Sequence, residues 1–347
     1  MNHQAAEEEL GEERSVAPAV PLAFIHSESA TWRKFEGDMP HLMRHLHPGH
    51  FRDGRDHVIA QPYLYLRGAG HDVCLTDALC SYAINIMHVD DLINYNEAWA
   101  HFVVVVQNDR PPPFVGNLCL VPRAGLVRRT DQHYIPAFVQ HGLIPRDGDR
   151  GREIRRIGYI GSPRNLVPEL QTNAFTEALK RRGVELVIKS SRWHWHDYSD
   201  LDLIVAMRPG AAMGYEYKPP TKLINAWASG TPALLYPEPG YEELRTGGDD
   251  YIEVRSVEDV LAAIDQLRQD PARYVRMLER CRCRAAEFSP DASIRRWLAF
   301  NRDTLQPAYG QWQGRRKAPP LWSQCLFRIR RRCYWQVRKR YVTKSWR

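Results

Sequence analysis

The sequence has few cysteines and no long apolar run. Its seven cysteines form no Cys-x-x-Cys pair and stand at no zinc-binding spacing with histidine, which argues against a disulfide framework or a structural metal. No stretch approaches the roughly 20 apolar residues that a membrane-spanning helix needs. Residues 1–20 lack the basic start and apolar core of a secretion signal, and we interpret them as an acidic, disordered leader. We therefore expect a cytoplasmic protein.

Positive charge is concentrated at the C-terminal end. The formal net charge is +7, but residues 315–347 hold twelve Lys/Arg and no Asp/Glu, so the rest of the chain has 36 basic and 41 acidic residues. The basic residues of the tail, 311–347, alternate with aromatic ones. This favours peripheral binding at the anionic inner face of a membrane. Nucleic acid is a less favoured partner because no recognised binding module accompanies the tail, and a solvated extension is a third alternative.

The 347 residues suit two domains. Apolar runs with β-strand character alternate with helical patterns in two series, which is typical of α/β domains with parallel sheets. We predict an N-terminal α/β domain over 21–140, a linker over 141–154 that is rich in Gly, Pro and charge, and a second α/β domain over 155–290. The cleft between the domains is then the main candidate for a functional site.

The stretch 217–241 predicts a short helix with a polar side. A doubled proline precedes a helical pattern over 221–229, and Gly230 is placed to end the helix. Thr221 is expected to cap its N-terminus. Apolar residues supply a packing surface, whereas polar ones recur at spacings of three and four along one side.

The start of this helix has the composition of an anion site. Lys218 and Lys222 add positive charge to the unpaired N–H groups of the first turn, which together suit a phosphate or diphosphate. Asn225, one turn further on, is placed to hydrogen-bond a ribose hydroxyl. The alternative interpretation is a packing helix whose lysines are only solvated.

The helix and the sequence ASGTPALLYPEPGYEEL (228–244) that continues it resemble the donor-site helix of GT-B glycosyltransferases, in particular the retaining glycosyltransferase family four. The resemblance implies two Rossmann-like domains facing across a cleft, here with a basic C-terminal tail, and a crossover helix over 291–310. It also implies that IGYIGSPRN (157–165) meets the diphosphate of a nucleotide sugar. The donor-binding residues that it adds are Gly161, Ser162, Arg164, Arg208 and Thr221.

One feature departs from that family. Two glutamates eight positions apart are common there, whereas Tyr217 and Asn225 occupy the aligned positions. The stereochemical outcome therefore stays open. Asp200 and Asp202 have the spacing of a metal motif from another glycosyltransferase fold, but the resemblance implies transfer without an essential metal or other cofactor.

Catalytic residues of the N-terminal domain are expected after its strands. His26 follows the first strand, and His88 and Asp91 follow a later one, so each is placed to orient or deprotonate an acceptor hydroxyl. A structural role is the alternative for each. We predict a glycosyltransferase that moves a sugar from a nucleotide sugar to a glycan or lipid-linked acceptor. The alternatives are a nucleotide-sugar epimerase of the same fold and a non-catalytic nucleotide-sugar or polyanion-binding protein.

Overall fold

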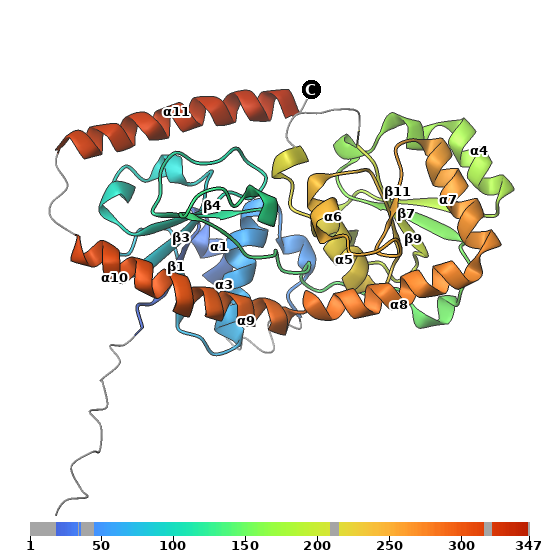
Figure 1. Cartoon of the computed structure of the whole chain (residues 1–347), viewed down its shortest axis with the longest axis horizontal. Helices are drawn as coiled ribbons and strands as arrows, with labels where there is room; N and C mark the ends of the chain where they lie inside the picture. Colours follow the sequence, from blue (N-terminus) through green and yellow to red (C-terminus); the bar gives the residue numbers. More distant parts are fainter. Residues whose placement is uncertain (1–18, 34, 36–44, 209–214, 316–320, 346–347) are drawn as a thin grey trace, which may run out of the picture.

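Two parallel β-sheets form the centres of two lobes. The computed structural model describes residues 19–33, 35, 45–208, 215–315 and 321–345. Most of the predicted leader lies outside these residues. In the N-terminal lobe the strand order is β2-β1-β3-β4-β5-β6, and in the C-terminal lobe it is β11-β10-β9-β7-β8 (Figure 1). The α/β class and the pair of Rossmann-like lobes that the sequence predicts are confirmed.

The strands are short and mostly buried. Parallel strands that are covered on both faces consist of continuous apolar residues, as in Val103–Val106, where all four valines are buried. The strands are β1 (Leu22–Ile25), β2 (Val73–Thr76), β3 (Ile84–His88), β4 (Val103–Val106), β5 (Leu118–Val121), β6 (Gln132–Tyr134), β7 (Arg156–Ile160), β8 (Glu185–Lys189), β9 (Leu203–Ala206), β10 (Ala233–Leu235) and β11 (Ile252–Glu253).

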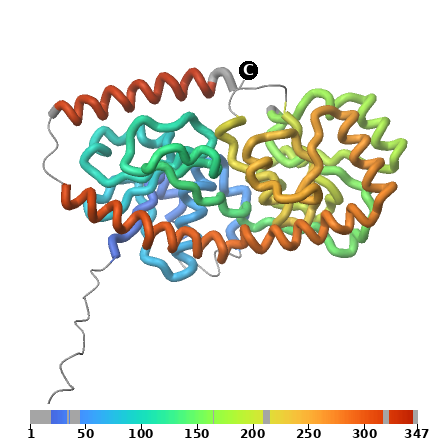
Figure 2. The backbone as a smooth tube through the Cα atoms, viewed as in Figure 1, coloured from blue at the N-terminus to red at the C-terminus, as the bar shows by residue number. Residues whose placement is uncertain are grey.

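Helices pack on both lobes and also connect them. Figure 2 shows one run of helices, α8 to α10, along one side of the molecule, and α11 along the other side of the N-terminal lobe. The helices are α1 (Ser29–Arg33), α3 (Gln61–Gly68), α4 (Asn173–Arg181), α5 (Thr221–Ser229), α6 (Pro239–Leu244), α7 (Val257–Gln269), α8 (Pro271–Glu287), α9 (Pro290–Phe300), α10 (Gln306–Gly314) and α11 (Leu321–Ser345).

The chain returns from the C-terminal lobe to the N-terminal lobe through α9. Trp297 of α9 is buried, and its ring lies 5.7 Å from that of Phe24 in β1. Leu305 and Tyr309, which follow α9, are buried in the same apolar core. The segment predicted to cross over thus completes the core of the first sheet.

Helix α11 packs on the N-terminal lobe with one face. Tyr334 is buried in the apolar cluster beside β1, β3 and β4, and its hydroxyl donates to the Pro111 carbonyl at 3.2 Å. Arg331 donates to the Ile93 carbonyl at 3.0 Å, and Arg338 pairs with Asp90. The tail is therefore a docked helix over its described length. Among the described residues, no helix is both long enough and apolar enough to cross a bilayer.

Candidate functional site

A cleft of about 370 Å³ lies between the two lobes. Its walls include residues that follow β4 and β7, and also the start of α5. Because the C-terminal ends of parallel strands commonly form ligand sites in such folds, this is the expected position for a substrate. Seven of the eight predicted donor-binding residues line it, namely Gly161, Ser162, Arg208, Lys218, Thr221, Lys222 and Asn225. The side chain of the eighth, Arg164, lies outside the described part of the chain.

The positive end of α5 faces this cleft. The helix has the predicted bounds, and Gly230 ends it with a left-handed φ of 69°. Thr221 does not cap it, however, because the N-cap position belongs to Pro220 and Thr221 is the first helical residue. No side chain in the described residues caps the first turn. Its N–H groups therefore remain available to an anion.

Lys222 reaches from α5 to the end of β7. Its Nζ donates to the Ile160 carbonyl and lies 5.3 Å from the centre of the Tyr159 ring. Gly161 follows with φ of 149°, and a Cβ there would lie 3.2 Å from Nζ, so glycine leaves room for the ammonium group. Burial, together with the neighbouring Arg208, lowers the pKa of Lys222 to about 8. An anion bound beside Nζ would restore a higher pKa.

Arg208, just beyond β9, supplies a second fixed cation. Its Nε donates to Glu238 Oε1 at 2.6 Å, and both side chains are largely buried. Burial disfavours the charged guanidinium, but the Glu238 carboxylate outweighs this and raises the pKa of Arg208. Sequence reasoning missed Glu238, although its place before Pro239, at the N-cap of α6, marks it as a residue at a strand-to-helix turn.

Two contacts join the lobes at the cleft. Lys218 donates to Asp109 Oδ2 at 2.7 Å, so this predicted donor residue is already paired with the N-terminal lobe. Asn225 accepts from the Gln140 backbone at 3.1 Å and donates to Gln140 Oε1 at 3.3 Å. A ribose contact by Asn225, as predicted, would require the amide to exchange these partners.

Asn108, next to Asp109, also lines the cleft, and no pattern in the sequence marks it as a site residue. It has φ of 51°, which is unusual for a residue with a side chain. Gly54 lies so close that a Cβ there would be 2.2 Å from the Asn108 amide nitrogen. The backbone strain is thus located where the N-terminal lobe meets the cleft.

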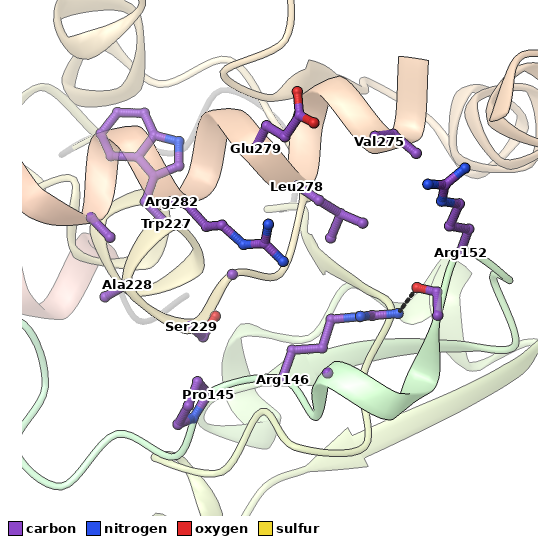
Figure 3. Close-up of a pocket in the computed structure, with 14 residues that line it drawn as sticks. Pro145, Arg146, Arg152, Trp227, Ala228, Ser229, Val275, Leu278, Glu279 and Arg282 are labelled. Carbon is purple, nitrogen blue, oxygen red and sulfur yellow. Dashed lines mark hydrogen bonds between the residues drawn. The ribbon is translucent and has the colours of Figure 1, made fainter. Parts of the chain in front are cut away.

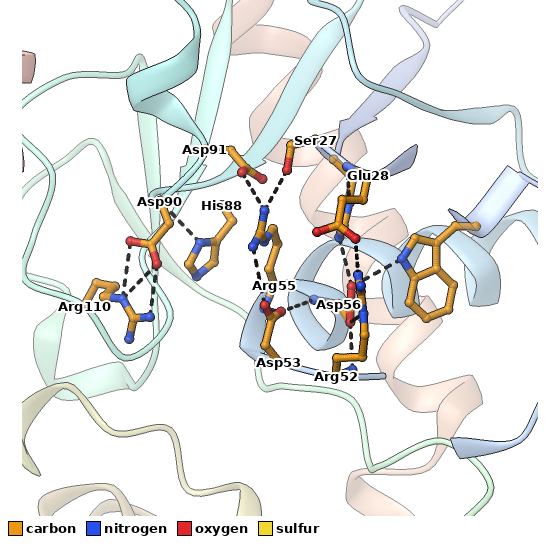
Figure 4. Close-up of polar contacts among 12 residues, drawn as sticks. Ser27, Glu28, Arg52, Asp53, Arg55, Asp56, His88, Asp90, Asp91 and Arg110 are labelled. Atoms are coloured by element: carbon orange, nitrogen blue, oxygen red, sulfur yellow. Dashed lines mark hydrogen bonds and ion pairs between the residues drawn. The ribbon is translucent and has the colours of Figure 1, made fainter. Parts of the chain in front are cut away.

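None of the three predicted catalytic residues is among the described residues that line this cleft. Figure 4 shows two of them, His88 and Asp91, within a network of polar contacts. His26 is fully buried, and both of its ring nitrogens are engaged: Nε2 with Asp56 Oδ1 at 3.0 Å, and Nδ1 with the Glu28 backbone N–H, also at 3.0 Å. The geometry favours a structural role for His26, because neither nitrogen is free to accept a proton.

His88 and Asp91 are also buried, at the C-terminal end of β3 in the N-terminal sheet. His88 accepts from the Asp90 backbone at 3.1 Å, and burial lowers the pKa of His88 to about 4. Asp91 Oδ1 accepts from Arg55 at 2.9 Å. His88 is the last residue of β3 rather than a residue after it, Asp91 follows that strand, and the structure places Arg55 and its carboxylate partners beside them.

Asp202 is part of an ion-pair cluster. Its carboxylate accepts from Arg150 at 2.8 Å, from Arg146 at 3.1 Å and from the backbone N–H groups of Arg155 and Arg156. Asp200 pairs instead with Lys189 at 2.6 Å. Arg156 contacts both carboxylates, through its backbone N–H for Asp202 and through its side chain for Asp200, so the Asp-x-Asp spacing has a structural explanation.

A second cavity, of about 440 Å³, lies between the linker, the C-terminal end of α5 and α8 (Figure 3). Its charged lining consists of Arg146, Arg152, Arg282 and Glu279. Arg146 already donates hydrogen bonds to Asp202 and to the Gly151 carbonyl. None of the predicted donor-binding residues lines this cavity, so the interlobe cleft is the better candidate.

The glycosyl transferase-like family matches residues 164–299, which include β9, α5 and Glu238. Two solved structures share the fold over nearly their whole length. HepE from Anabaena, crystallised with UDP-glucose, is 10% identical, with a TM-score of 0.50 over 82% of this chain and 99% of HepE. Sucrose-phosphate synthase from Thermosynechococcus elongatus is 11% identical, with a TM-score of 0.53 over 82% of this chain and 99% of the synthase.

The chain spans only 54% of TarM, which it matches at 13% identity over 62% of its own length with a TM-score of 0.44. No curated protein sequence matches the chain. Membership of family four stays a prediction. Residues 164–299 are thus similar to the glycosyl transferase-like family, and the two lobes share the GT-B fold of HepE and sucrose-phosphate synthase.

Proposed function

We propose that the chain transfers a sugar from a nucleoside diphosphate sugar to a hydroxyl group of a glycan or lipid-linked acceptor, without an essential metal ion. The observation that carries the donor assignment is the meeting of an uncapped helix N-terminus with Lys222 and Arg208 in one cleft. The reaction breaks the bond between the sugar and the diphosphate. Fixed positive groups at that point stabilise the charge that develops on the leaving diphosphate.

The partners of these cations support a diphosphate over a smaller anion. Lys222 is anchored at Ile160, the last residue of β7, whereas Arg208 follows the neighbouring strand β9 and is anchored at Glu238. Lys222 belongs to the first turn of α5 and Arg208 lines the same cleft, so together they can bind two phosphate groups rather than one. HepE, which shares the fold, was crystallised with UDP-glucose, and uridine is therefore the first base to test.

A panel of nucleoside diphosphates and their sugar derivatives tests the donor assignment by thermal shift. A ligand at 100 times its dissociation constant should stabilise the native chain by about 2.7 kcal/mol. Incubation with acceptor glycans, with and without a chelator, then separates the functions. Donor consumption with a glycosylated product supports transfer, an epimerised donor would indicate an epimerase, and binding without turnover would indicate a non-catalytic protein.

The acceptor proposal rests on the exposed face of α11. Trp322 is 67% exposed and Ile329 is 58% exposed, and Leu326 and Val337 continue the same stripe along the helix. Exposed arginines, among them Arg330 and Arg332, flank it. An apolar stripe between arginines suits the interface of an anionic bilayer, where each basic residue contributes about 1 kcal/mol. We propose that this face holds the enzyme at an anionic membrane that carries its acceptor.

Replacing Trp322 and Ile329 together by serine should weaken binding to acidic liposomes about tenfold or more, since burial of one large apolar side chain contributes roughly 1.5–3 kcal/mol. The melting temperature should stay the same because both side chains point away from the lobe. Sedimentation with acidic liposomes, neutral liposomes and single-stranded RNA provides the measurement. Tight binding to RNA by a chain that ignores acidic liposomes would contradict the membrane proposal.

A further inference from the structure

Residues 53–60 form an unusual turn at the wall of the cleft. The π-helical segment Asp56–Ala60 leads directly into α3, and such wide turns are frequent at functional sites. Asp56 anchors the turn from below, because its buried carboxylate accepts from the Arg52 backbone at 2.7 Å and pairs with His26 at 3.0 Å. The next residue, His57, lines the cleft together with Gly54 and Val58.

The hydrogen bonds around His57 determine which ring nitrogen carries the proton. Gln61 Nε2 lies 2.6 Å from the Val139 carbonyl oxygen, which can only accept, so the amide group of Gln61 must point its NH₂ there. Gln61 Oε1 is then an acceptor, and it lies 3.3 Å from His57 Nδ1. Nδ1 therefore donates, and the lone pair of the neutral ring is on Nε2.

His57 Nε2 has no hydrogen-bond partner among the described residues. It is also not among the described side-chain atoms that are fully buried and lack a hydrogen-bond partner. Phe51 stacks on the ring with centroids 5.3 Å apart and an interplanar angle of 19°, which fixes its orientation. Burial lowers the pKa of His57, although the Gln61 hydrogen bond and the Asp56 and Asp53 carboxylates oppose this shift. His57 is thus held neutral and ready to accept a proton.

We infer that His57 is the general base that removes the proton from the acceptor hydroxyl. The inference rests on the proposed function, since His57 and the donor-binding Lys222 line the same cleft from different lobes. The hydroxyl proton passes to Nε2 while the oxygen bonds to C1 of the sugar. The bond from C1 to the diphosphate oxygen breaks, and its electron pair leaves with the diphosphate. A direct displacement of this kind inverts the configuration at C1.

The positions aligned with the family-four glutamates agree with this chemistry. They hold Tyr217 and Asn225, and Asn225 is engaged with Gln140. The base then comes from the opposite lobe. Its nearest ionisable neighbours are Asp53, Asp56 and His141.

The test uses the full chain with a nucleoside diphosphate sugar and the acceptor that the transfer screen identifies. His57→Gln should lower kcat by roughly 10²–10⁴-fold, the usual contribution of a general base, while donor affinity changes less than twofold. The acid limb of the wild-type kcat/KM profile, which reflects the lowered pKa of His57, should disappear. His133→Gln, on β6 and outside the described cleft lining, is the matched control and should keep full activity.

Two further measurements keep the inference falsifiable if one variant folds poorly. Imidazole should restore part of the activity of His57→Ala, and the wild-type product should have the inverted configuration. Unchanged kcat in His57→Gln, or a retained configuration, would overturn the inference and leave the donor assignment intact. A wild-type chain that binds no nucleoside diphosphate and consumes no donor would overturn the proposed function and the inference with it.

Discussion

A Lys222→Ala variant should bind a nucleoside diphosphate about ten- to a hundredfold more weakly than the wild-type chain, with little change in its affinity for the matching nucleoside. Lys222 Nζ lies at the start of α5 and at the Gly161 turn, where we place the diphosphate. A hydrogen bond to a charged group contributes roughly 1.5–3 kcal/mol. The nucleoside lacks that partner, so isothermal titration calorimetry with both ligands isolates the phosphate contribution.

The pH dependence of this binding has a defined sign. The pKa of Lys222 is lowered to about 8, so the side chain loses its charge as the pH rises through that value. Diphosphate affinity should therefore decline above about pH 8 in the wild type, and less so in Lys222→Ala. Lys180→Ala, which removes an exposed lysine of α4, is the matched control. Equal losses for nucleoside and diphosphate would contradict the assignment of Lys222 to phosphate.

An Asp202→Asn variant should lose about 3–5 kcal/mol of unfolding free energy. Asp202 is fully buried, and the side chain of Arg146 beside it is only 6% exposed. Removing one partner of a buried ion pair leaves the other charge uncompensated, with a cost of that size. Urea unfolding followed by circular dichroism measures it. Asp200→Asn, at a carboxylate that is 32% exposed, should cost about 1 kcal/mol or less.

The stability that Asp202 provides should also depend on pH. Burial alone would raise the pKa of Asp202, but hydrogen bonds from Arg150 and the backbone lower it below the ordinary value. A carboxyl group with a lowered pKa stabilises the native state above its unfolded pKa and loses that effect as the pH falls through the native value. The wild type should therefore lose more stability on acidification than Asp202→Asn. If Asp202→Asn is no less stable than Asp200→Asn, the cluster does not have the role described.

The donor half of the site could be predicted because its information is local. A doubled proline, nine helical residues and a glycine define α5, and the positions of Lys218 before it and Lys222 in its first turn follow from the sequence. The partners of these residues could not be predicted. Whether Asn225 is free or bound to Gln140 depends on how the two lobes meet, which no local pattern encodes.

The N-terminal half of the site was harder to predict for two physical reasons. His26 was correctly placed at a strand end, but its partner Asp56 comes from a turn that is distant in sequence. His57 lies in a π-helical turn, for which the sequence has no distinct periodicity. The sequence therefore indicated polar groups at this edge of the sheet, but not which histidine faces the cleft.

The docked face of α11 was missed because two of its members are arginines. Phe327, Arg331, Tyr334 and Arg338 recur at helical spacing and turn toward the N-terminal lobe. In a pattern of apolar residues, Arg331 and Arg338 count as interruptions. In the structure they belong to the docked face, because Arg331 donates to the Ile93 carbonyl and Arg338 donates to Asp90. Removing 315–347 would therefore expose the apolar cluster around Tyr334.

Segments that follow the C-terminal lobe in sequence pack on the N-terminal lobe, and this affects the order in which the two lobes can fold on the ribosome. The apolar core of the N-terminal lobe includes Trp297, Leu305 and Tyr309, and a second cluster includes Tyr334. The principal apolar clusters of the C-terminal lobe draw on residues no later than 288. Domains usually fold from the N-terminus onward during synthesis. Here the lobe made second has the residues of its core first, and the nascent N-terminal sheet keeps apolar surface uncovered until residues 297–334 have been made.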